Sequence, residues 1–252
     1  MHFHYQSSVR LQLDKLRDHG CPMLSPRRPH IKKASLLVIG LVVMFFSHSH
    51  GQSRAQNDSV VAVMCQTLLR ADGYPDSTKV IIVFQEHLKP YLSQFPENQA
   101  EEIWSNIYFR LQRNCSEFRR ILQALRSPSE EWNEVGERPV SKLNKKTCRE
   151  FLQQKNCRYV QAPGDTVMLT VNDGYWIDHF KDGTYSKLKF TWIDECEFEI
   201  EFIESNNDVR KNFSKPGDRY RYQLLEQKDN YYSVSAQIVG TASYALFRIL
   251  YD

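Results

Sequence analysis

The stretch TYSKLKFTWIDECEFEIEFI, residues 184–203, decides the fold of the C-terminal part of the chain. Lysines and glutamates alternate in it with apolar side chains, which is typical of two strands that each turn one face to a core and the other to solvent. The faces match when Trp192 lies opposite Cys196 and residues 193–195 form the loop, because a slip of one residue would reverse every side chain. The cross-strand pairs expected from this hairpin are Lys189 with Glu199, Lys187 with Glu201, Phe190 with Phe198 and Leu188 with Ile200.

A second hairpin precedes this one, and Asp182-Gly183 is a strong signal for its two-residue turn. This turn places Asp178 opposite Lys187 on the charged outer face, which we interpret as a solvated sheet surface rather than a carboxylate-based active site. It also turns His179 inward, opposite Ser186. The other pairs expected from the same turn are Trp176 with Lys189 and Ile177 with Leu188.

Further short segments of the same alternating kind surround these hairpins, and turn residues separate them. Such regular spacing favours an antiparallel meander that closes as a barrel or curls as a half-barrel. Residues 148–252 are therefore expected to form one β domain. The expected strands are 156–161, 166–171, 175–180, 184–192, 196–203, 218–226, 230–239 and 242–250.

Residues 58–126 have a different pattern, because their apolar side chains recur with the spacing of helices. Pro90 should kink or end the second of these helices. The last part, residues 97–126, contains no Gly or Pro. It is either one long helix or two helices with a break at Asn114. Residues 127–147 are polar and contain two Pro and one Gly, which is typical of a linker. We thus expect an α+β protein of two domains, a small helical domain followed by the β meander.

The N-terminal part of the chain resembles an export signal. Four basic residues precede an apolar run at 34–46, and small residues follow it at the two critical positions, Ser49 and Gly51. A basic region, a short apolar core and a small-residue cleavage site define a secretory signal peptide. Residues 1–51 are therefore expected to be a signal peptide with an N-terminal extension, although a retained membrane anchor is the alternative. After cleavage the chain would have no stable membrane span and would lie in the periplasm or cell envelope, or be secreted.

The charge of the chain argues against nucleic acid as a partner. The whole chain has a formal charge of +3, but residues 52–252 hold only 26 basic against 28 acidic side chains. A surface that neutralises phosphates is usually basic.

Five cysteines follow the expected cleavage point, and an exported chain meets an oxidising compartment that favours disulfides. Cys65 and Cys115 both lie on apolar helical stripes of one segment, so we expect them to pair. In the other segment we expect Cys148 to pair with Cys196, which leaves Cys157 unpaired. Buried unpaired thiols are the alternative for either bridge. The spacings match no zinc pattern, so no metal is expected.

Few residues are available for catalysis. Only His87 and His179 remain after cleavage, and the chain has no phosphate-binding loop, nucleophile elbow or zinc-protease motif. We expect no cofactor. An inward His179 could act as general base to Ser186, although a core histidine is the simpler interpretation. The inward aromatic side chains could line a ligand cavity or could fill the core. The weak candidates for ligand binding are Tyr175, His179, Phe190, Trp192 and Phe198.

A short motif in the β domain suggests a family. Its residues are an early Cys148, then Trp192, Cys196, Phe198 and Ile200. This W-x-x-x-C-x-[YF]-x-[LI] pattern resembles that of small uncharacterised exported proteins of Bacteroidota-type bacteria. The resemblance implies an envelope location and a lipocalin- or calycin-like β domain, and it implies no catalytic residues.

Three functions fit these observations. The first is a non-catalytic envelope protein whose β domain binds a small apolar ligand, a lipid or a protein partner. The second is a hydrolase or isomerase that uses His179 with Ser186 at the barrel mouth. The third is a structural or assembly module that acts through the helical domain. An enclosed cavity with His179 pointing into it would favour the ligand or enzyme hypotheses, and a filled interior would favour the interaction module.

Overall fold

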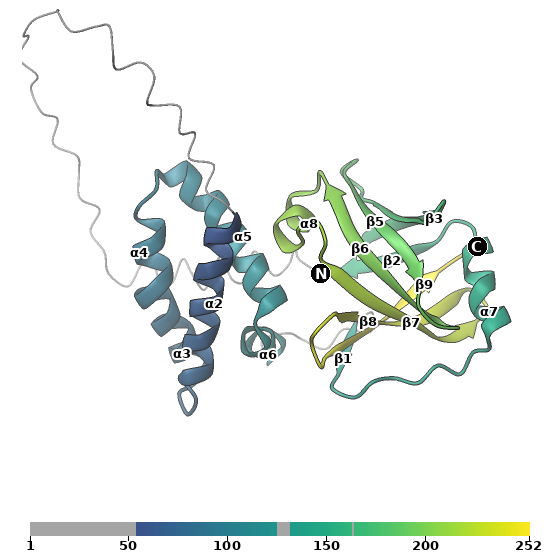
Figure 1. The fold of residues 1–252 in the computed structure, drawn as a ribbon, viewed down its shortest axis with the longest axis horizontal. Helices are drawn as coiled ribbons and strands as arrows, with labels where there is room; N and C mark the ends of the chain where they lie inside the picture. The colour runs from purple at the N-terminus through teal and green to yellow at the C-terminus, as the bar shows by residue number, and fades with distance from the viewer. Residues whose placement is uncertain (1–53, 125–131, 163) are drawn as a thin grey trace, which may run out of the picture.

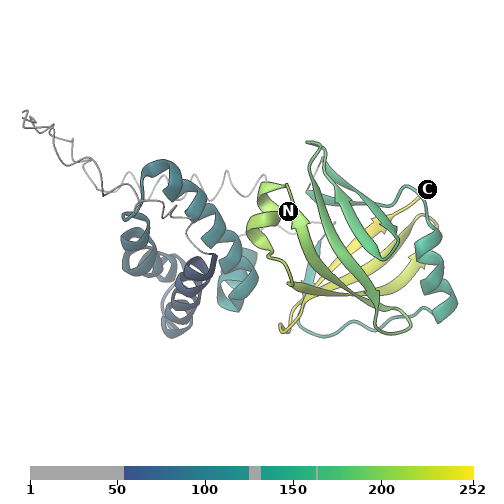
Figure 2. The same ribbon diagram turned by 45° about the horizontal axis from the view of Figure 1, so that its top comes forward.

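A computed structural model describes residues 54–124, 132–162 and 164–252 of the chain. The expected signal peptide therefore lies outside the described residues. A helical module and a β-barrel lie side by side, and a short helix, α8 (Asp208–Phe213), lies between them in both views (Figures 1 and 2). The expected combination of a helical N-terminal domain and a C-terminal β domain is confirmed.

The helical module follows the apolar spacing of the sequence closely. Pro90 does not end its helix, because residues Phe84–Leu88 widen into a π-helix ahead of it and the chain stays helical through Leu92. The last helix breaks at Cys115, whose φ of −118° and ψ of 112° are extended, one residue after the expected break. The helices are α2 (Arg54–Arg70), α3 (Asp76–Val83), the π-helix η1 (Phe84–Leu88), α4 (Lys89–Leu92), α5 (Glu97–Asn114) and α6 (Ser116–Ala124).

The core of this module forms where α2, α5 and α6 meet. Its most buried side chains include Val61 and Leu68 of α2, Ile107 of α5 and Ile121 of α6. The expected disulfide between Cys65 and Cys115 joins α2 to the break between α5 and α6.

The β domain is a closed antiparallel barrel of eight strands, β2 to β9, in which each strand pairs with the next along the chain. Closure occurs where β9 pairs with β2, at Arg158 and Leu250. Each strand lies within two residues of the expected bounds. The strands are β2 (Arg158–Ala162), β3 (Asp165–Asn172), β4 (Tyr175–His179), β5 (Tyr185–Trp192), β6 (Glu197–Ser205), β7 (Arg219–Lys228), β8 (Tyr231–Ile238) and β9 (Tyr244–Leu250).

Part of the expected linker belongs to the barrel instead. Residues Asn133–Val135 form a ninth strand, β1. It pairs with residues 244–246 of β9, whereas β2 pairs with β9 at Leu250. Trp132 stacks on Phe247 with ring centroids 4.3 Å apart. These contacts were not expected because a three-residue strand is too short to show a period.

The β5–β6 hairpin keeps the expected faces but not the expected register. Trp192 lies opposite Phe198 rather than Cys196, so β6 is displaced by two residues and Lys189 pairs with Glu201. The displacement occurs because the amides of residues 193 and 194 both donate to the carbonyl of Glu197, which lengthens the loop to four residues. This even displacement, which holds from Leu188 to Trp192, leaves each side chain on the same face; a bulge beyond it places Lys187 opposite Glu204 rather than the expected Glu201.

One end of the barrel is closed by helix α7 (Lys145–Glu150) and the 3₁₀ turn η2 (Phe151–Gln153), which lie at the far end from α8 (Figures 1 and 2). The expected disulfide between Cys148 and Cys196 ties α7 to the β5–β6 loop. Cys157 is buried and free, as expected. No helix in the described ranges is long and apolar enough to cross a membrane.

Candidate functional site

The β4–β5 hairpin differs from the expected one by a single residue, and this changes which side chains reach the barrel interior. Gly183 has a φ of +81°, which glycine adopts readily, and the amide of Phe180 donates to the carbonyl of Thr184 at 2.9 Å. Three residues therefore form the turn rather than two. The observed pairs are Trp176 with Leu188, Ile177 with Lys187, Asp178 with Ser186 and His179 with Tyr185.

Because the displacement is odd, the predicted faces of β4 are wrong. Trp176 and Asp178 point inward, and Asp178 is only 6% exposed. His179 is exposed on the outer face, where its Nε2 lies 3.4 Å from Oγ1 of Thr170. Tyr175, also expected inward, is 36% exposed and is covered by Nζ of Lys187 at 4.1 Å from its ring centroid.

The catalytic pair proposed for His179 and Ser186 does not form. Ser186 is 1% exposed and points into the barrel, whereas His179 points out of it. The Ser186 hydroxyl donates to Oγ of Ser205 at 2.9 Å. The two side chains therefore lie on opposite faces of the sheet, and no general base reaches this serine from His179.

The remaining ligand candidates fill the barrel rather than line a cavity. Phe190 and Phe198 are buried with ring centroids 4.7 Å apart. Trp192 is half-buried, packs on Phe198, and has the guanidinium of Arg149 4.2 Å above its ring. Phe151 of η2 enters from the closed end and packs against Phe198.

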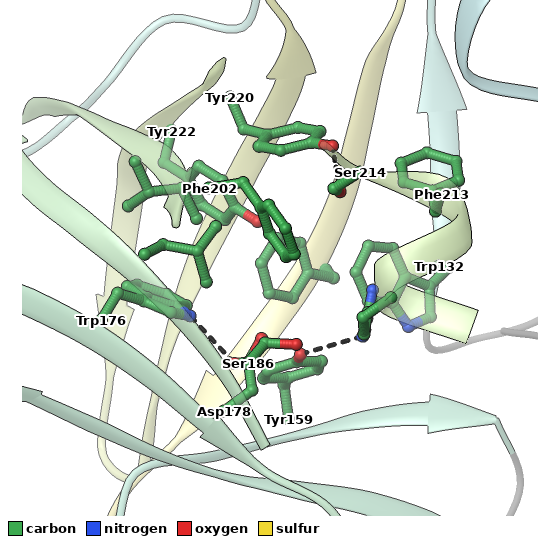
Figure 3. Close-up of a pocket in the computed structure, with 14 residues that line it drawn as sticks. Trp132, Tyr159, Trp176, Asp178, Ser186, Phe202, Phe213, Ser214, Tyr220 and Tyr222 are labelled. Carbon is green, nitrogen blue, oxygen red and sulfur yellow. Dashed lines mark hydrogen bonds between the residues drawn. The ribbon is translucent and has the colours of Figure 1, made fainter. Parts of the chain in front are cut away.

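A pocket of about 90 Å³ lies at the opposite end of the barrel, beneath α8 (Figure 3). It combines an aromatic wall with one basic, one acidic and several hydroxyl side chains. Its lining residues are Trp132, Tyr159, Trp176, Asp178, Ser186, Leu188, Ile200, Phe202, Arg210, Phe213, Ser214, Tyr220, Tyr222 and Phe247.

Helix α8 places the basic group of this pocket. Asn207 caps the helix by accepting from the amide of Arg210 at 3.2 Å, and its side-chain amide donates to Thr184 Oγ1 at 2.8 Å. The guanidinium of Arg210 donates through Nη2 to the hydroxyl of Tyr159 at 3.2 Å and to Oε1 of Gln161 at 2.5 Å. Its Nε is buried and has no hydrogen-bond partner in the described part of the chain.

The acidic group of the pocket is Asp178. Its Oδ1 accepts from Nε1 of Trp176 at 2.9 Å (Figure 3). Burial raises the pKa of the Asp178 carboxyl, although the charge of Arg210 opposes this shift. Burial also raises the pKa of the hydroxyls of Tyr159 and Tyr222, so both stay neutral hydrogen-bonding groups. Within the described residues, Arg210 and Asp178 form no ion pair at 4.0 Å or less, although the charge of each acts on the other.

The size of the pocket limits what it can hold. About 90 Å³ is less than the roughly 150 Å³ of a cavity that binds benzene, and far less than the roughly 300–1,000 Å³ of sites for drug-sized ligands. In the described parts of the chain, no three His, Cys, Asp or Glu side chains are grouped so that they could hold a metal ion. The arrangement suits hydrogen bonding and charge pairing with a molecule of a few heavy atoms.

Sequence reasoning missed the two charged groups of this site. A two-residue turn would place Asp178 on the outer charged face, whereas the observed three-residue turn places it in the interior. Arg210 was not singled out, because the segment between β6 and β7 is polar and has no apolar period. The one available signal was Asn207 before Asp208, which is a typical start of a short helix.

The fold and the pocket define a two-module α+β protein, in which a closed eight-stranded antiparallel barrel holds a small cavity with both polar and apolar lining at the end that faces a helical bundle. No family model, curated protein or solved structure matches this chain. The function is therefore inferred from the pocket and the placement of its side chains.

Proposed function

We propose that this chain is a non-catalytic binding protein of the cell envelope, whose barrel takes a small ligand into the pocket beneath α8. The observation that carries the proposal is the pocket itself, which brings buried charged and hydroxyl groups together at one end of the barrel. A buried polar group that lacks a hydrogen-bond partner lowers stability. An unpaired group of this kind in a cavity, here Nε of Arg210, therefore supports a role of the cavity in ligand binding.

The pocket supports a small, partly polar ligand better than a lipid. Aromatic side chains such as Phe151, Phe190 and Phe198 occupy the closed end and middle of the barrel, and the pocket of about 90 Å³ is too small for an acyl chain. An up-and-down barrel of eight strands is the architecture of lipocalins, so a calycin-type relationship is part of the proposal. The binding site would then be much reduced compared with the ligand cavity of such a barrel.

Export through the membrane is the second part of the proposal. Two disulfides join residues about fifty positions apart, and disulfides are typical of oxidising compartments such as the periplasm. The basic residues and the apolar run at 34–46 support removal of residues 1–51 as a signal peptide. A location in the periplasm, in the envelope or outside the cell fits both features.

The test uses the full chain, purified without denaturation. Native mass spectrometry and ligand-observed NMR with a mixture of small polar molecules should detect a bound molecule. Ser186→Leu fills the cavity and should abolish this binding. Ser233→Leu is the matched control, because Ser233 is half-buried on β8 between the inward Tyr232 and Val234 and so points away from the pocket.

The outcomes separate clearly. Binding that is lost in S186L and kept in S233L supports the proposal. Binding that survives in a folded S186L places the ligand elsewhere and overturns it, as does the absence of any bound molecule. If S186L does not fold by near-UV circular dichroism, Ser214→Val reduces the same cavity from the α8 side and replaces it in the test.

A further inference from the structure

We propose that the ligand is a short carboxylic acid, bound as its carboxylate by Arg210 while Asp178 carries a proton. This inference rests on the proposed function and names the chemical class of the ligand. It follows from the pairing of Arg210, the position of Asp178 and the small size of the cavity.

The guanidinium of Arg210 has an unused donor. Its Nη2 already donates to both Tyr159 and Gln161, whereas its buried Nε has no partner among the described residues. A buried donor without an acceptor is unfavourable, and a carboxylate is the acceptor whose geometry and charge suit a guanidinium best. A bound carboxylate would therefore complete the hydrogen bonding of Arg210.

The charge of Arg210 is not neutralised by direct contact. Its ion-pair distance to Asp178 exceeds 4.0 Å, and the hydroxyl of Tyr159 lies between them in the network. Inside a barrel the effective dielectric constant is low, so an anion that enters the pocket is strongly attracted to this cation. The pocket thus favours anions over neutral or cationic molecules.

A second carboxylate in the pocket would repel an ionised Asp178. The groups that act on Asp178 are Arg210 on α8, Tyr159 on β2, Trp176 and His179 on β4, and on β7 the neutral Tyr222. Desolvation by burial has a larger effect on the pKa of Asp178 than any of these groups, and it favours the protonated acid. Binding of an anion should therefore be coupled to proton uptake by Asp178.

The side chains that line the pocket determine the chemistry and size of the rest of the ligand. Leu188, Ile200 and Phe202 provide an apolar side that suits a short alkyl group. A cavity of about 90 Å³ leaves room for only a few heavy atoms beside the carboxylate. Acids of roughly two to four carbons fit this description.

The test compares three probes of similar shape on the unmodified full chain: propionate, propionamide and propylammonium. Isothermal titration calorimetry should give a dissociation constant for propionate about tenfold or more below that for propionamide, because a charged hydrogen bond is lost with the amide. Propylammonium should not bind measurably. If propionamide or propylammonium binds as tightly as propionate, the inference fails while the proposed function stands. If none of the three binds, the inference fails, and the mass-spectrometry and NMR test of the mixture decides the proposed function separately.

Variants then test the two residues separately. Arg210→Gln should weaken propionate binding by about tenfold or more, whereas Arg248→Gln, on the exposed outer face of β9, should leave it unchanged. Equal effects of the two substitutions would overturn the role of Arg210. Arg210→Lys serves if the glutamine variant does not fold, and it should keep part of the affinity because its charge remains.

Proton uptake is measured by calorimetry of propionate binding in buffers with different heats of ionisation. The unmodified protein should take up a proton on binding, and Asp178→Asn should bind propionate without proton uptake and at least as tightly. Proton uptake that persists unchanged in D178N, or propionate binding that is lost in a folded D178N, would contradict the assignment to Asp178.

Discussion

Arg110 of α5 joins the two modules of the protein, and its replacement tests how strongly they depend on each other. Its Nε donates to Asp58 of α2 at 2.8 Å, and its Nη1 donates to Asp218 at 2.9 Å and to the carbonyl of Phe213 at 3.0 Å. Asp218 and Phe213 belong to the barrel domain, so these bonds cross between the modules. The Arg110 side chain is only 6% exposed, and neighbouring charge raises its pKa despite the opposing effect of burial.

The expected cost of Arg110→Gln can be worked from these contacts. Removing one partner of a buried ion pair typically costs about 3–5 kcal/mol, because a buried charge is left alone. Here each carboxylate keeps another cation, since Lys215 lies 2.7 Å from Asp58 and Arg113 lies 3.0 Å from Asp218. We therefore expect a loss of about 2–3 kcal/mol in the free energy of unfolding.

Arg120→Gln is the matched control. Arg120 also contacts two carboxylates, those of Asp76 and Glu117, but its side chain is 49% exposed. Solvent screens such a pair, so the expected loss is below about 1 kcal/mol. The two variants thus differ in burial and in the crossing between modules, and not in the type of substitution.

The assay is urea unfolding followed by far-UV circular dichroism, which reports mainly the helices, and by tryptophan fluorescence, which reports mainly the barrel. The two curves should coincide in the unmodified protein and separate in R110Q, because the contact between the modules is weakened. If R110Q loses no more stability than R120Q, the reasoning about the buried network is refuted.

Three further predictions concern stability and reactivity. Hydrogen bonding by Arg120 lowers the pKa of Glu117 from 4.5 to about 2, so the stability that Glu117 contributes is present above pH 4.5 and is lost as the pH falls toward 2. Glu117→Gln should remove this part of the acid dependence in unfolding curves, and an unchanged acid dependence would contradict the assignment. Phe151→Ala should lower the free energy of unfolding in urea by about 3–5 kcal/mol, because it empties the closed end of the barrel. Leu152→Ala, at an exposed position, should lower it much less. Equal losses would contradict the role of Phe151 in filling this end. Burial raises the pKa of the Cys157 thiol, so a thiol reagent should label it only after unfolding, and rapid labelling of the native protein would show that it is accessible.

Most of the fold could be predicted from side-chain periodicity. The helical module and the eight barrel strands follow from apolar spacing, and the Cys65–Cys115 disulfide follows from two cysteines on the apolar helical faces. The expected pairing of Cys148 with Cys196 rests instead on their shared place in the β segment. Strand β1 and helix α7 could not be predicted in the same way, because three and six residues are too few for a period and their stability comes from tertiary contacts.

The site was far less predictable than the fold, because it depends on one turn. Asp182-Gly183 is compatible with both a two-residue and a three-residue turn, and a left-handed Gly183 suits either; the Phe180–Thr184 hydrogen bond is what distinguishes them. Because the turn has three residues, Asp178 rather than His179 points into the barrel. The position of Arg210 depends on how α8 lies across the barrel end, which is a tertiary property that local sequence does not encode.

Helix α8 belongs to both modules, since Val209 and Phe213 pack against the helical core while Arg210 reaches into the barrel pocket. A barrel transplanted by recombination into another protein would therefore expose the apolar surface of Val209 and Phe213 that the helical module covers. The barrel could be inherited without the helical module only if another structure covered the apolar side of α8. The two halves of this chain are thus expected to evolve together, with changes on α5 answered by changes on α8.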